Sequence, residues 1–398
     1  MKKKIALFIS TLNSGGAERV VSHLSKILSV LYDVHIILYE DVIEYEYEGT
    51  LHILNVPATA KNGLSKVRLL LKRVKKLKKL IKNEKIDCII SFLDSPNFVN
   101  LLTKSTNCKR IISIRNYSKR ENKKTFLGKL TDFFIKRLYR KADYIVTVSE
   151  LIKQSYIKEY KLPKKKIVTI YNPYNFNEID EKSIIPLKSK EENFYYGNFV
   201  FINVGRIMYQ KGIWHLLKAF LLVYKRYKNV RLVLVGEDLS NGKVMRFIEQ
   251  AGLEDIVLLT GRTKNPYQYL KNSNCYVLSS LFEGFPNAMV EAMACGCTII
   301  AADCKSGPKE ILCKEPDLFT KIDKTTIVDF GIMVPDLEPE ENWDLTYITE
   351  GEKELAEAMI FVLDKSEETE KLINLAKKRS YDFSFDKCKE EYFKIIDN

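Results

Sequence analysis

Residues 279–291 read Ser-Ser-Leu-Phe-Glu-Gly-Phe-Pro-Asn-Ala-Met-Val-Glu. An apolar run at 275–279 predicts a strand, Gly284 and Pro286 turn the chain, and a helix is expected from Asn287 to a cap at Gly296. Proline suits a helix start, where no amide hydrogen is needed. The turn and the helix N-terminus expose several N–H groups, and the helix dipole adds partial positive charge. The stretch therefore predicts an anion site suited to a diphosphate.

Two carboxylates flank this anion site. Glu283 comes before the helix, and Glu291 lies one turn inside it, four residues after Asn287. Carboxylates so placed can accept hydrogen bonds from hydroxyl groups on either side of a diphosphate.

Cationic side chains follow a second predicted strand, at 199–204. Arg206 comes directly after Gly205 at its end, and Lys211 precedes the next predicted helix. Arginine and lysine at the end of a parallel strand can clamp phosphate oxygens that gain charge as a bond to phosphate breaks.

Two further features stand at predicted strand ends. Arg262 and Thr263 follow the strand at 256–260, and Gly15-Gly16 follows the first strand, at 4–9. A pair of glycines lets the backbone approach a ligand closely.

Strands and helices alternate along both halves of the chain, which predicts an α/β fold of parallel sheets with crossover helices. At 398 residues the chain is long enough for two doubly wound domains. We expect domains at 1–172 and 173–371, a linker over 171–198, and an irregular loop at 314–350. A C-terminal helix at 372–398 is expected to pack back on the first domain.

The charge is unevenly distributed. Residues 1–172 carry a net +20, so the remainder of a chain of net +13 carries −7. Eleven cations and one acid lie in residues 61–85, where apolar residues recur at helical spacing and predict a stripe on the core: Val67, Leu70, Leu71, Val74, Leu77, Leu80 and Ile81. With a second cluster at 119–124, this excess favours an anionic membrane surface as a partner.

Metal binding has no signature in the sequence. The four histidines show no metal-ligand spacing, and no Asp-x-Asp motif occurs. We therefore expect no required metal or other cofactor, since side chains and helix amides can neutralise a diphosphate.

These pieces together resemble the retaining glycosyltransferases of family 4, which have the GT-B fold of two Rossmann-like domains facing a cleft. The resemblance covers nearly the whole chain. It rests on 13–19, Gly205-Arg206 with Lys211-Gly212, 235–237, Gly261-Arg262, 283–291 and 306–312.

The resemblance implies roles for single residues. Arg206 and Lys211 would grip the donor diphosphate, Glu291 the ribose hydroxyls and Glu283 the donor sugar, so that Glu283, Arg206 and Lys211 carry catalysis. Other donor contacts are expected from Gly15, Gly16, Arg262, Thr263, Gly284, Phe285, Asn287 and Ala288.

The acceptor side departs from the family pattern. Many members carry a histidine after the strand that here ends at Ile114, whereas this chain has Arg115 and Asn116 there. These two are expected near the acceptor, and no general base is assigned. The segment 317–349 is also longer than usual.

The function implied is retaining transfer from a nucleotide-diphosphate sugar, expected to be a UDP-sugar, to a glycan or lipid-linked glycan in bacterial surface polysaccharide synthesis. The protein would be cytoplasmic and peripheral on the inner face of the cell membrane. A nucleotide-sugar epimerase of the same fold remains an alternative. A basic nucleic-acid-binding protein does not account for Glu283 and Glu291, so no nucleic acid partner is expected.

Overall fold

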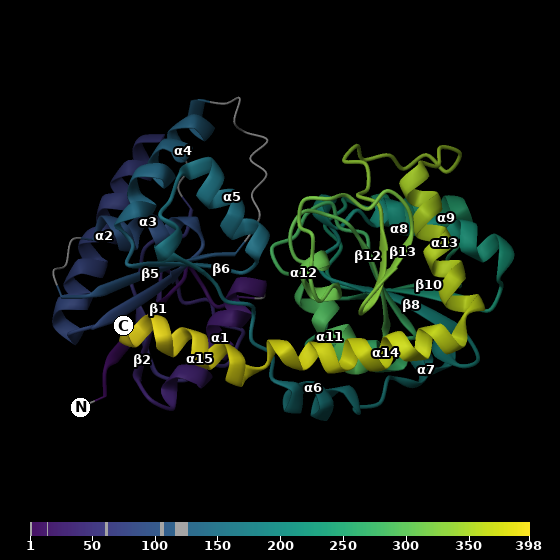
Figure 1. Ribbon diagram of the computed structural model, residues 1–398, viewed down its shortest axis with the longest axis horizontal. Helices are drawn as coiled ribbons and strands as arrows, with labels where there is room; N and C mark the ends of the chain where they lie inside the picture. Colours follow the sequence, from purple (N-terminus) through teal and green to yellow (C-terminus); the bar gives the residue numbers. More distant parts are fainter. Residues whose placement is uncertain (1, 14, 60–62, 104–106, 116–125) are drawn as a thin grey trace. The chain divides into compact units, whose positions relative to one another are not determined.

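The computed structural model describes residues 2–13, 15–59, 63–103, 107–115 and 126–398 (Figure 1). The chain forms two compact units. Unit 1 comprises Met1–Tyr174 and Phe385–Asn398, and unit 2 comprises Asn175–Ser384.

Unit 1 is built on a parallel seven-stranded sheet of order β3-β2-β1-β4-β5-β6-β7. Its central strands are continuous apolar runs because helices cover both faces. The strands are β1 Lys4–Phe8, β2 Asp33–Leu38, β3 Thr50–Ile53, β4 Cys88–Phe92, β5 Lys109–Ile114, β6 Tyr144–Thr147 and β7 Ile167–Thr169.

One face of this sheet is covered by α1 and α15, and the other by α2 and α3 (Figure 1). The helices of unit 1 are α1 Gly16–Ser29, α2 Gly63–Glu84, α3 Asp94–Leu102, α4 Phe126–Leu138, α5 Glu150–Tyr160 and α15 Phe385–Asp397. Short 3-10 turns stand at η2 Tyr139–Lys141 and η3 Lys164–Lys166.

Unit 2 repeats the doubly wound plan with strand order β10-β9-β8-β11-β12-β14-β13, in which only the edge strand β13 is antiparallel. The strands are β8 Phe199–Val204, β9 Val230–Val235, β10 Val257–Gly261, β11 Cys275–Leu278, β12 Thr298–Ala302, β13 Thr326–Val328 and β14 Gly331–Val334.

Helices α8, α9 and α13 pack around one core of unit 2, while α6, α10, α11 and α14 contact one another on the other face. Their bounds are α6 Phe176–Ser183, α7 Ser189–Tyr195, α8 Ile213–Arg226, α9 Lys243–Ala251, α10 Tyr267–Asn272, α11 Asn287–Cys295, α12 Pro308–Leu312, α13 Glu350–Asp364 and α14 Ser366–Ser380, with η4 at Tyr209–Lys211 and η5 at Tyr381–Phe383.

The C-terminal segment differs from the prediction of one continuous helix. Helix α14 ends at Ser380, and α15 begins at Phe385. The two phenylalanines that flank the break join different cores: Phe383 packs on Phe285 of unit 2, and Phe385 packs on His23 of unit 1. The chain must therefore leave the helical path at Ser384, where its backbone is extended.

Two expectations about irregular segments also need correction. Within 314–350, predicted as loop, β14 pairs in parallel with β12 and all four of its residues are buried. Within 171–198, predicted as a linker, α6 and α7 form as part of unit 2. These elements are short, so local periodicity is weak, and contacts with the sheet or neighbouring helices decide their structure.

The apolar stripe predicted for α2 faces the core only in part. Leu77 and Ile81 are buried, and Leu70, Val74 and Leu80 pack against the same core cluster. In contrast, Val67 is 59% exposed and Leu71 64% exposed. The first turns of α2 therefore present apolar side chains on the surface.

Candidate active site

The carboxyl ends of four neighbouring strands in unit 2 form one edge, where ligands bind in open α/β sheets. Gly205 follows β8, Gly236 follows β9, Gly261 ends β10 and Ser279 follows β11. A Cβ atom added to Gly236 would lie 2.0 Å from the Gly205 carbonyl oxygen. Glycine therefore allows the two backbones to approach closely at this edge.

Lys211 and Glu283 meet at this edge. Lys211 Nζ donates to Glu283 Oε1 at 2.7 Å, and the side chains are only 16% and 8% exposed. Ser280 Oγ donates to the same oxygen, also at 2.7 Å. The ammonium is therefore held in place by a carboxylate that is itself fixed by a second donor.

The backbone around Lys211 is held by the neighbouring strand. Ser279 Oγ donates to the Lys211 carbonyl oxygen at 2.9 Å. Gly212 has φ 56°, and a Cβ atom there would lie 2.3 Å from the Ser279 carbonyl oxygen. Only glycine fits this left-handed turn without displacing the Ser279 carbonyl group, so Gly212 helps to fix the backbone that carries the Lys211 ammonium.

The turn that carries Glu283 is fixed by the loop after β12. The Glu283 amide donates to the Lys305 carbonyl oxygen at 3.0 Å, and Ser306 Oγ donates to the Gly284 carbonyl oxygen at 2.8 Å. Gly307 has φ 97°, and a Cβ atom there would lie 2.5 Å from Pro286 Cδ. Ser306 and Gly307 therefore support the turn that carries Glu283.

Helix α11 starts at Asn287 and ends before Gly296, a left-handed C-cap with φ 91°, as predicted. Asn287 and Ala288 are partly exposed, whereas Phe285 is buried against Phe383. The N-terminus of α11 therefore presents Asn287 and Ala288, next to the turn that bears Glu283.

Glu291 is 1% exposed inside α11. Burial raises the pKa of the Cys295 thiol to about 12, and the negative charge of Glu291 adds to this shift. The predicted ribose ligand is thus a buried carboxylate one turn behind the helix N-terminus.

The remaining predicted donor residues of unit 2 also lie at this edge. Arg206 and Arg262 are exposed after β8 and β10. Thr263 Oγ1 accepts from the Asn265 amide at 3.2 Å, which orders the turn after β10. The structure therefore brings the predicted donor residues from Arg206 to Glu291 to the carboxyl edge of one sheet.

The predicted residues of unit 1 form a separate group. Gly15 caps α1 in an extended conformation, and Gly16 is the first residue of that helix. Arg115 is buried and donates through Nη2 to Asn172 Oδ1, and burial lowers the pKa of its guanidinium. Asn116, the other predicted acceptor-side residue, lies outside the described residues.

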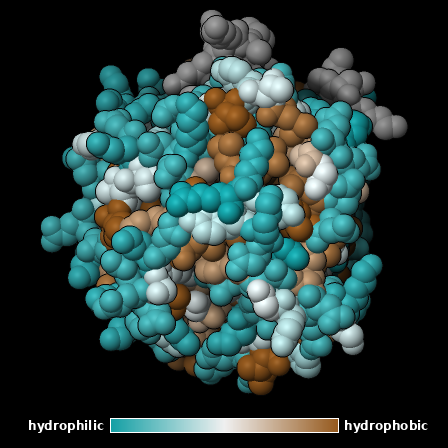
Figure 2. All heavy atoms as spheres, turned by 90° about the vertical axis from the view of Figure 1, so that its right-hand side faces the viewer, coloured by the Kyte–Doolittle hydropathy of each residue, from teal (hydrophilic) through white to brown (hydrophobic). Residues whose placement is uncertain are grey.

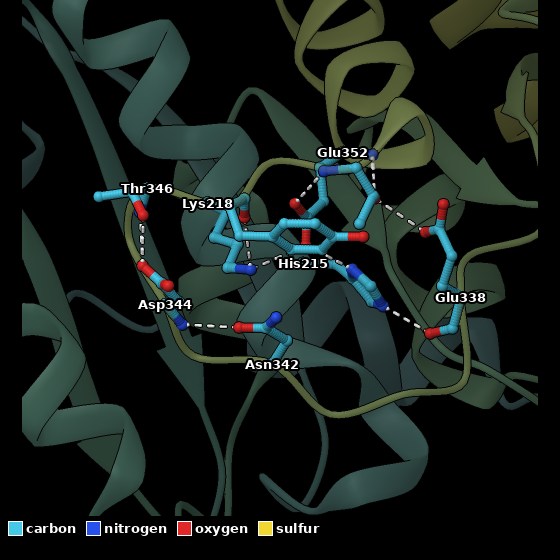
Figure 3. A network of polar contacts seen from close by, with 9 residues as sticks. His215, Lys218, Glu338, Asn342, Asp344, Thr346 and Glu352 are labelled. Carbon is cyan, nitrogen blue, oxygen red and sulfur yellow. Dashed lines mark hydrogen bonds and ion pairs between the residues drawn. The ribbon is translucent and has the colours of Figure 1, made fainter.

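A buried polar network in unit 2 was not predicted (Figure 3). His215 Nδ1 lies 2.8 Å from Glu352 Oε1, and His215 Nε2 lies 2.9 Å from the Glu338 carbonyl oxygen. Lys218 Nζ lies 3.5 Å from Glu352 Oε1 and donates to the Tyr347 carbonyl oxygen at 2.9 Å. The network ties the segment 338–352 to α8. The sequence did not predict it, because a single histidine at the start of an apolar helix does not indicate its partner.

The same segment braces the turn that bears Lys211. Tyr209 Oη donates to the Pro339 carbonyl oxygen at 2.5 Å, and Trp214 packs on Trp343 with ring centroids 6.1 Å apart. A cavity of about 190 Å³ lies between these aromatic side chains, and none of the predicted donor residues lines it.

Comparison with known proteins identifies the family of the chain. The model of the family Glycosyl transferases group 1 matches residues 185–321, and that of Glycosyltransferase Family 4 matches residues 14–178. An uncharacterized glycosyltransferase of Methanocaldococcus jannaschii is 33% identical, with 94% of each chain covered. An N-acetylgalactosamine-N,N'-diacetylbacillosaminyl-diphospho-undecaprenol 4-alpha-N-acetylgalactosaminyltransferase of Campylobacter jejuni is also 33% identical, over 78% of this chain and 83% of the relative.

A solved structure supports the fold. The Anabaena HepE protein in complex with UDP and glucose superposes with a TM-score of 0.73 at 17% identity, over 99% of each chain. Its likeness concerns the fold alone, and it agrees with the predicted α/β GT-B architecture of two Rossmann-like units. With a relative 33% identical over 94% of its length, the chain belongs to glycosyltransferase family 4 and is a glycosyltransferase.

Proposed function

We propose that the protein transfers a sugar from a UDP-sugar, with retention at the anomeric carbon, to a lipid-linked glycan used in bacterial surface polysaccharide synthesis. The contact between Lys211 and Glu283 at the carboxyl edge of the unit 2 sheet carries this proposal. The name of the Campylobacter jejuni relative supports the acceptor class, because it specifies a diphospho-undecaprenol-linked acceptor.

Lys211 and Arg206 would hold the leaving diphosphate. The Lys211 ammonium is largely shielded from solvent, so its attraction for a phosphate oxygen is stronger than that of an exposed lysine. Arg206 is exposed at the end of β8, so it can turn toward the same group. The N–H groups at the start of α11 would add partial positive charge.

Glu283 would serve the donor sugar through its second oxygen. Oε1 accepts from Lys211 and Ser280, while Oε2 has only a long contact of 3.5 Å with Gln210 Nε2 among the hydrogen bonds described for it. Oε2 can therefore accept from a sugar hydroxyl without loss of the lysine contact. Glu291 would accept from the ribose hydroxyls.

The reaction proposed is a front-face displacement. The bond between the anomeric carbon and the β-phosphate oxygen breaks, the acceptor oxygen bonds to that carbon on the same face, and the acceptor proton passes to the departing phosphate oxygen. No general base is needed in this scheme. Positioning and stabilisation of the charge on the diphosphate then supply most of the catalysis. The side chains and amides at the edge would do this with no required metal.

Unit 1 would bring the enzyme to the membrane through α2. Val67, Leu71, Lys75, Lys78 and Lys82 follow one another at helical spacing, and all five are exposed. Apolar side chains next to cations on one exposed stripe suit the interface of an anionic leaflet.

Hydrophilic side chains cover most of the face of unit 2 seen in Figure 2, where apolar ones form scattered patches.

Not every cation of α2 belongs to this surface. Arg73 is buried over the Tyr39 ring, and Lys76 Nζ donates to the Leu54 carbonyl oxygen at 2.6 Å.

Among the described residues, no helix is long and apolar enough to cross a membrane. We place the protein on the cytoplasmic face of the cell membrane, held by its exposed cations, and expect no nucleic acid partner. Arg115 would lie toward the acceptor.

The test is incubation with a panel of nucleotide sugars, with and without an undecaprenyl-diphosphate-linked saccharide, followed by detection of nucleotide and of the extended lipid. The proposal predicts UDP release that depends on the lipid-linked acceptor, and an α-linked product from an α-linked donor. Interconversion of nucleotide sugars without transfer would instead support the epimerase. Transfer only to water-soluble glycans would overturn the proposed acceptor.

A further inference from the structure

Three side chains that can bind a metal ion meet in unit 1, although the sequence suggested no such site. They are His35 in β2, His52 in β3 and Glu84 at the end of α2, and their ligand atoms all lie within 4.8 Å of one another. In the register of β2 and β3, His35 is opposite Thr50, and His52 is opposite Ile37. Side chains two residues apart share a face of a sheet, so both histidines point to the face that α2 covers.

A hydrogen bond between ring nitrogen atoms joins the two imidazole side chains. His35 Nδ1 lies 2.8 Å from His52 Nε2, and the ring planes differ by 8°. His35 is 2% exposed, and its other ring nitrogen, Nε2, is buried without a hydrogen bond, 3.7 Å from Asp33 Oδ1. In metal sites the second nitrogen of a ligating histidine commonly faces a carboxylate, which fixes the tautomer that leaves the first nitrogen free to bind.

We propose that His35, His52 and Glu84 form a binding site for a divalent transition metal of the Zn²⁺ class. The ligands are His35 Nδ1, His52 Nε2 and a carboxylate oxygen of Glu84, with water in the fourth position, and two imidazoles with one carboxylate suit such ions. Tetrahedral bonds to two imidazole nitrogens place them about 3.3 Å apart. The present 2.8 Å therefore has to widen by about half an ångström.

The metal site belongs to the sheet of unit 1, whereas the candidate active site belongs to the sheet of unit 2. Helix α2 ends beside the amino end of the unit 1 strands, since Asp87, just after it, accepts from the Lys4 amide at the start of β1. Donor residues cluster at carboxyl ends of strands in unit 2. The metal would thus fasten the four-residue edge strand β3 to β2 and α2, a structural role independent of the proposed function.

The experiment is a titration of untagged, chelator-stripped full-length protein with Co²⁺, followed by visible absorption and calorimetry. We expect one Co²⁺ per chain with the intense visible bands of a four-coordinate site, displacement by Zn²⁺, and a higher melting temperature with metal. His52→Gln should abolish the bands, and Glu84→Gln should weaken binding at least about tenfold. Asp33→Asn should weaken it about 10–100-fold, as expected for the loss of a carboxylate behind a ligand.

Glu46→Gln is the matched control, because Glu46 is an exposed glutamate of the same unit with its side chain 91% exposed, and it should bind Co²⁺ as the wild type does. Unchanged binding in His52→Gln and Glu84→Gln, or only the faint spectrum of hexa-aqua Co²⁺ in the wild type, would overturn the proposal. If His52→Gln lowers the melting temperature of the metal-free protein, its loss of binding could reflect unfolding. The test of the proposal is then Co²⁺ binding by Glu84→Gln, because Glu84 lies on the helix surface.

Discussion

Glu283 Oε1 lies 2.7 Å from Lys211 Nζ, although 72 residues separate the two in the chain. The contact forms because β8 and β11 are neighbours in the sheet, so that the segments after them share one edge. It joins a cation and a carboxylate, both largely buried, at the edge where we propose that the donor binds. The following expectations depend on this arrangement.

Replacing Lys211 with alanine should lower turnover by a factor of about 100 or more, the loss seen when a partner of transition-state charge is removed. The mutant also leaves Glu283 without its cation. Steady-state kinetics on the preferred nucleotide sugar measures the effect. Lys225→Ala, at an exposed site in the last turn of α8, is the control and should keep normal turnover. Near-normal turnover in Lys211→Ala would mean that the lysine has only a structural role.

Replacing Glu291 with alanine should weaken donor binding by about 1–3 kcal/mol, because charged hydrogen bonds to the ribose are lost. Calorimetry on the folded mutant measures this, and Glu291→Gln distinguishes loss of charge from loss of the side chain. Glu249→Ala, on the exposed face of α9, is the matched control. Unchanged donor affinity in folded Glu291→Ala would remove the ribose assignment.

Local sequence patterns predicted much of this fold, including the strands and the helix that carry the candidate donor site. Strands expected at 199–204 and 275–279 form as β8 Phe199–Val204 and β11 Cys275–Leu278, and the helix after Pro286 begins and ends where its capping residues indicate. These elements carry strong local signals, namely runs of mostly apolar residues, a proline at a helix start and a glycine C-cap.

What the sequence could not provide depends on distant contacts. The strand β14 has four residues and was missed, because its pairing with β12 rather than its own pattern makes it a strand. The meeting of His35 with His52 depends on the register of two parallel strands. The buried His215–Glu352 contact likewise joins residues that are far apart in the chain.

Glu352→Ala should lower the free energy of unfolding by about 3–5 kcal/mol, because it leaves Lys218, which is 0% exposed, without its carboxylate. Urea unfolding followed by circular dichroism gives the value. Glu350→Ala in the same helix removes an exposed ion pair with Lys353 and should cost at most about 1 kcal/mol. Equal effects of the two substitutions would show that the buried network contributes little.

Transfer activity should survive excess chelator, since side chains and helix amides neutralise the diphosphate in this proposal. Initial rates with and without EDTA provide the measurement, at a temperature well below the melting point so that loss of a structural metal has no effect on folding. Complete loss that Mn²⁺ or Mg²⁺ restores would contradict the proposal.

Binding to vesicles should require anionic lipid and weaken with salt, because each exposed cation near such a surface contributes about 1 kcal/mol and is screened. Lys75, Lys78 and Lys79 changed together to glutamine should reduce co-sedimentation and activity on a lipid-linked acceptor while hydrolysis of the donor persists. Changing Lys225, Lys271 and Lys324 of unit 2 to glutamine removes as much charge and should have little effect. Equal losses in both triple mutants would indicate a general charge effect.

The most direct test of the proposed donor site is a crystal structure of the protein with its UDP-sugar. The proposal predicts the diphosphate within hydrogen-bond distance of Lys211 Nζ and of the N–H groups at the start of α11, a sugar hydroxyl on Glu283, and the ribose on Glu291. A nucleotide bound elsewhere, for example in the cavity between Trp214 and Trp343, without contact to Lys211 or Glu283, would contradict it.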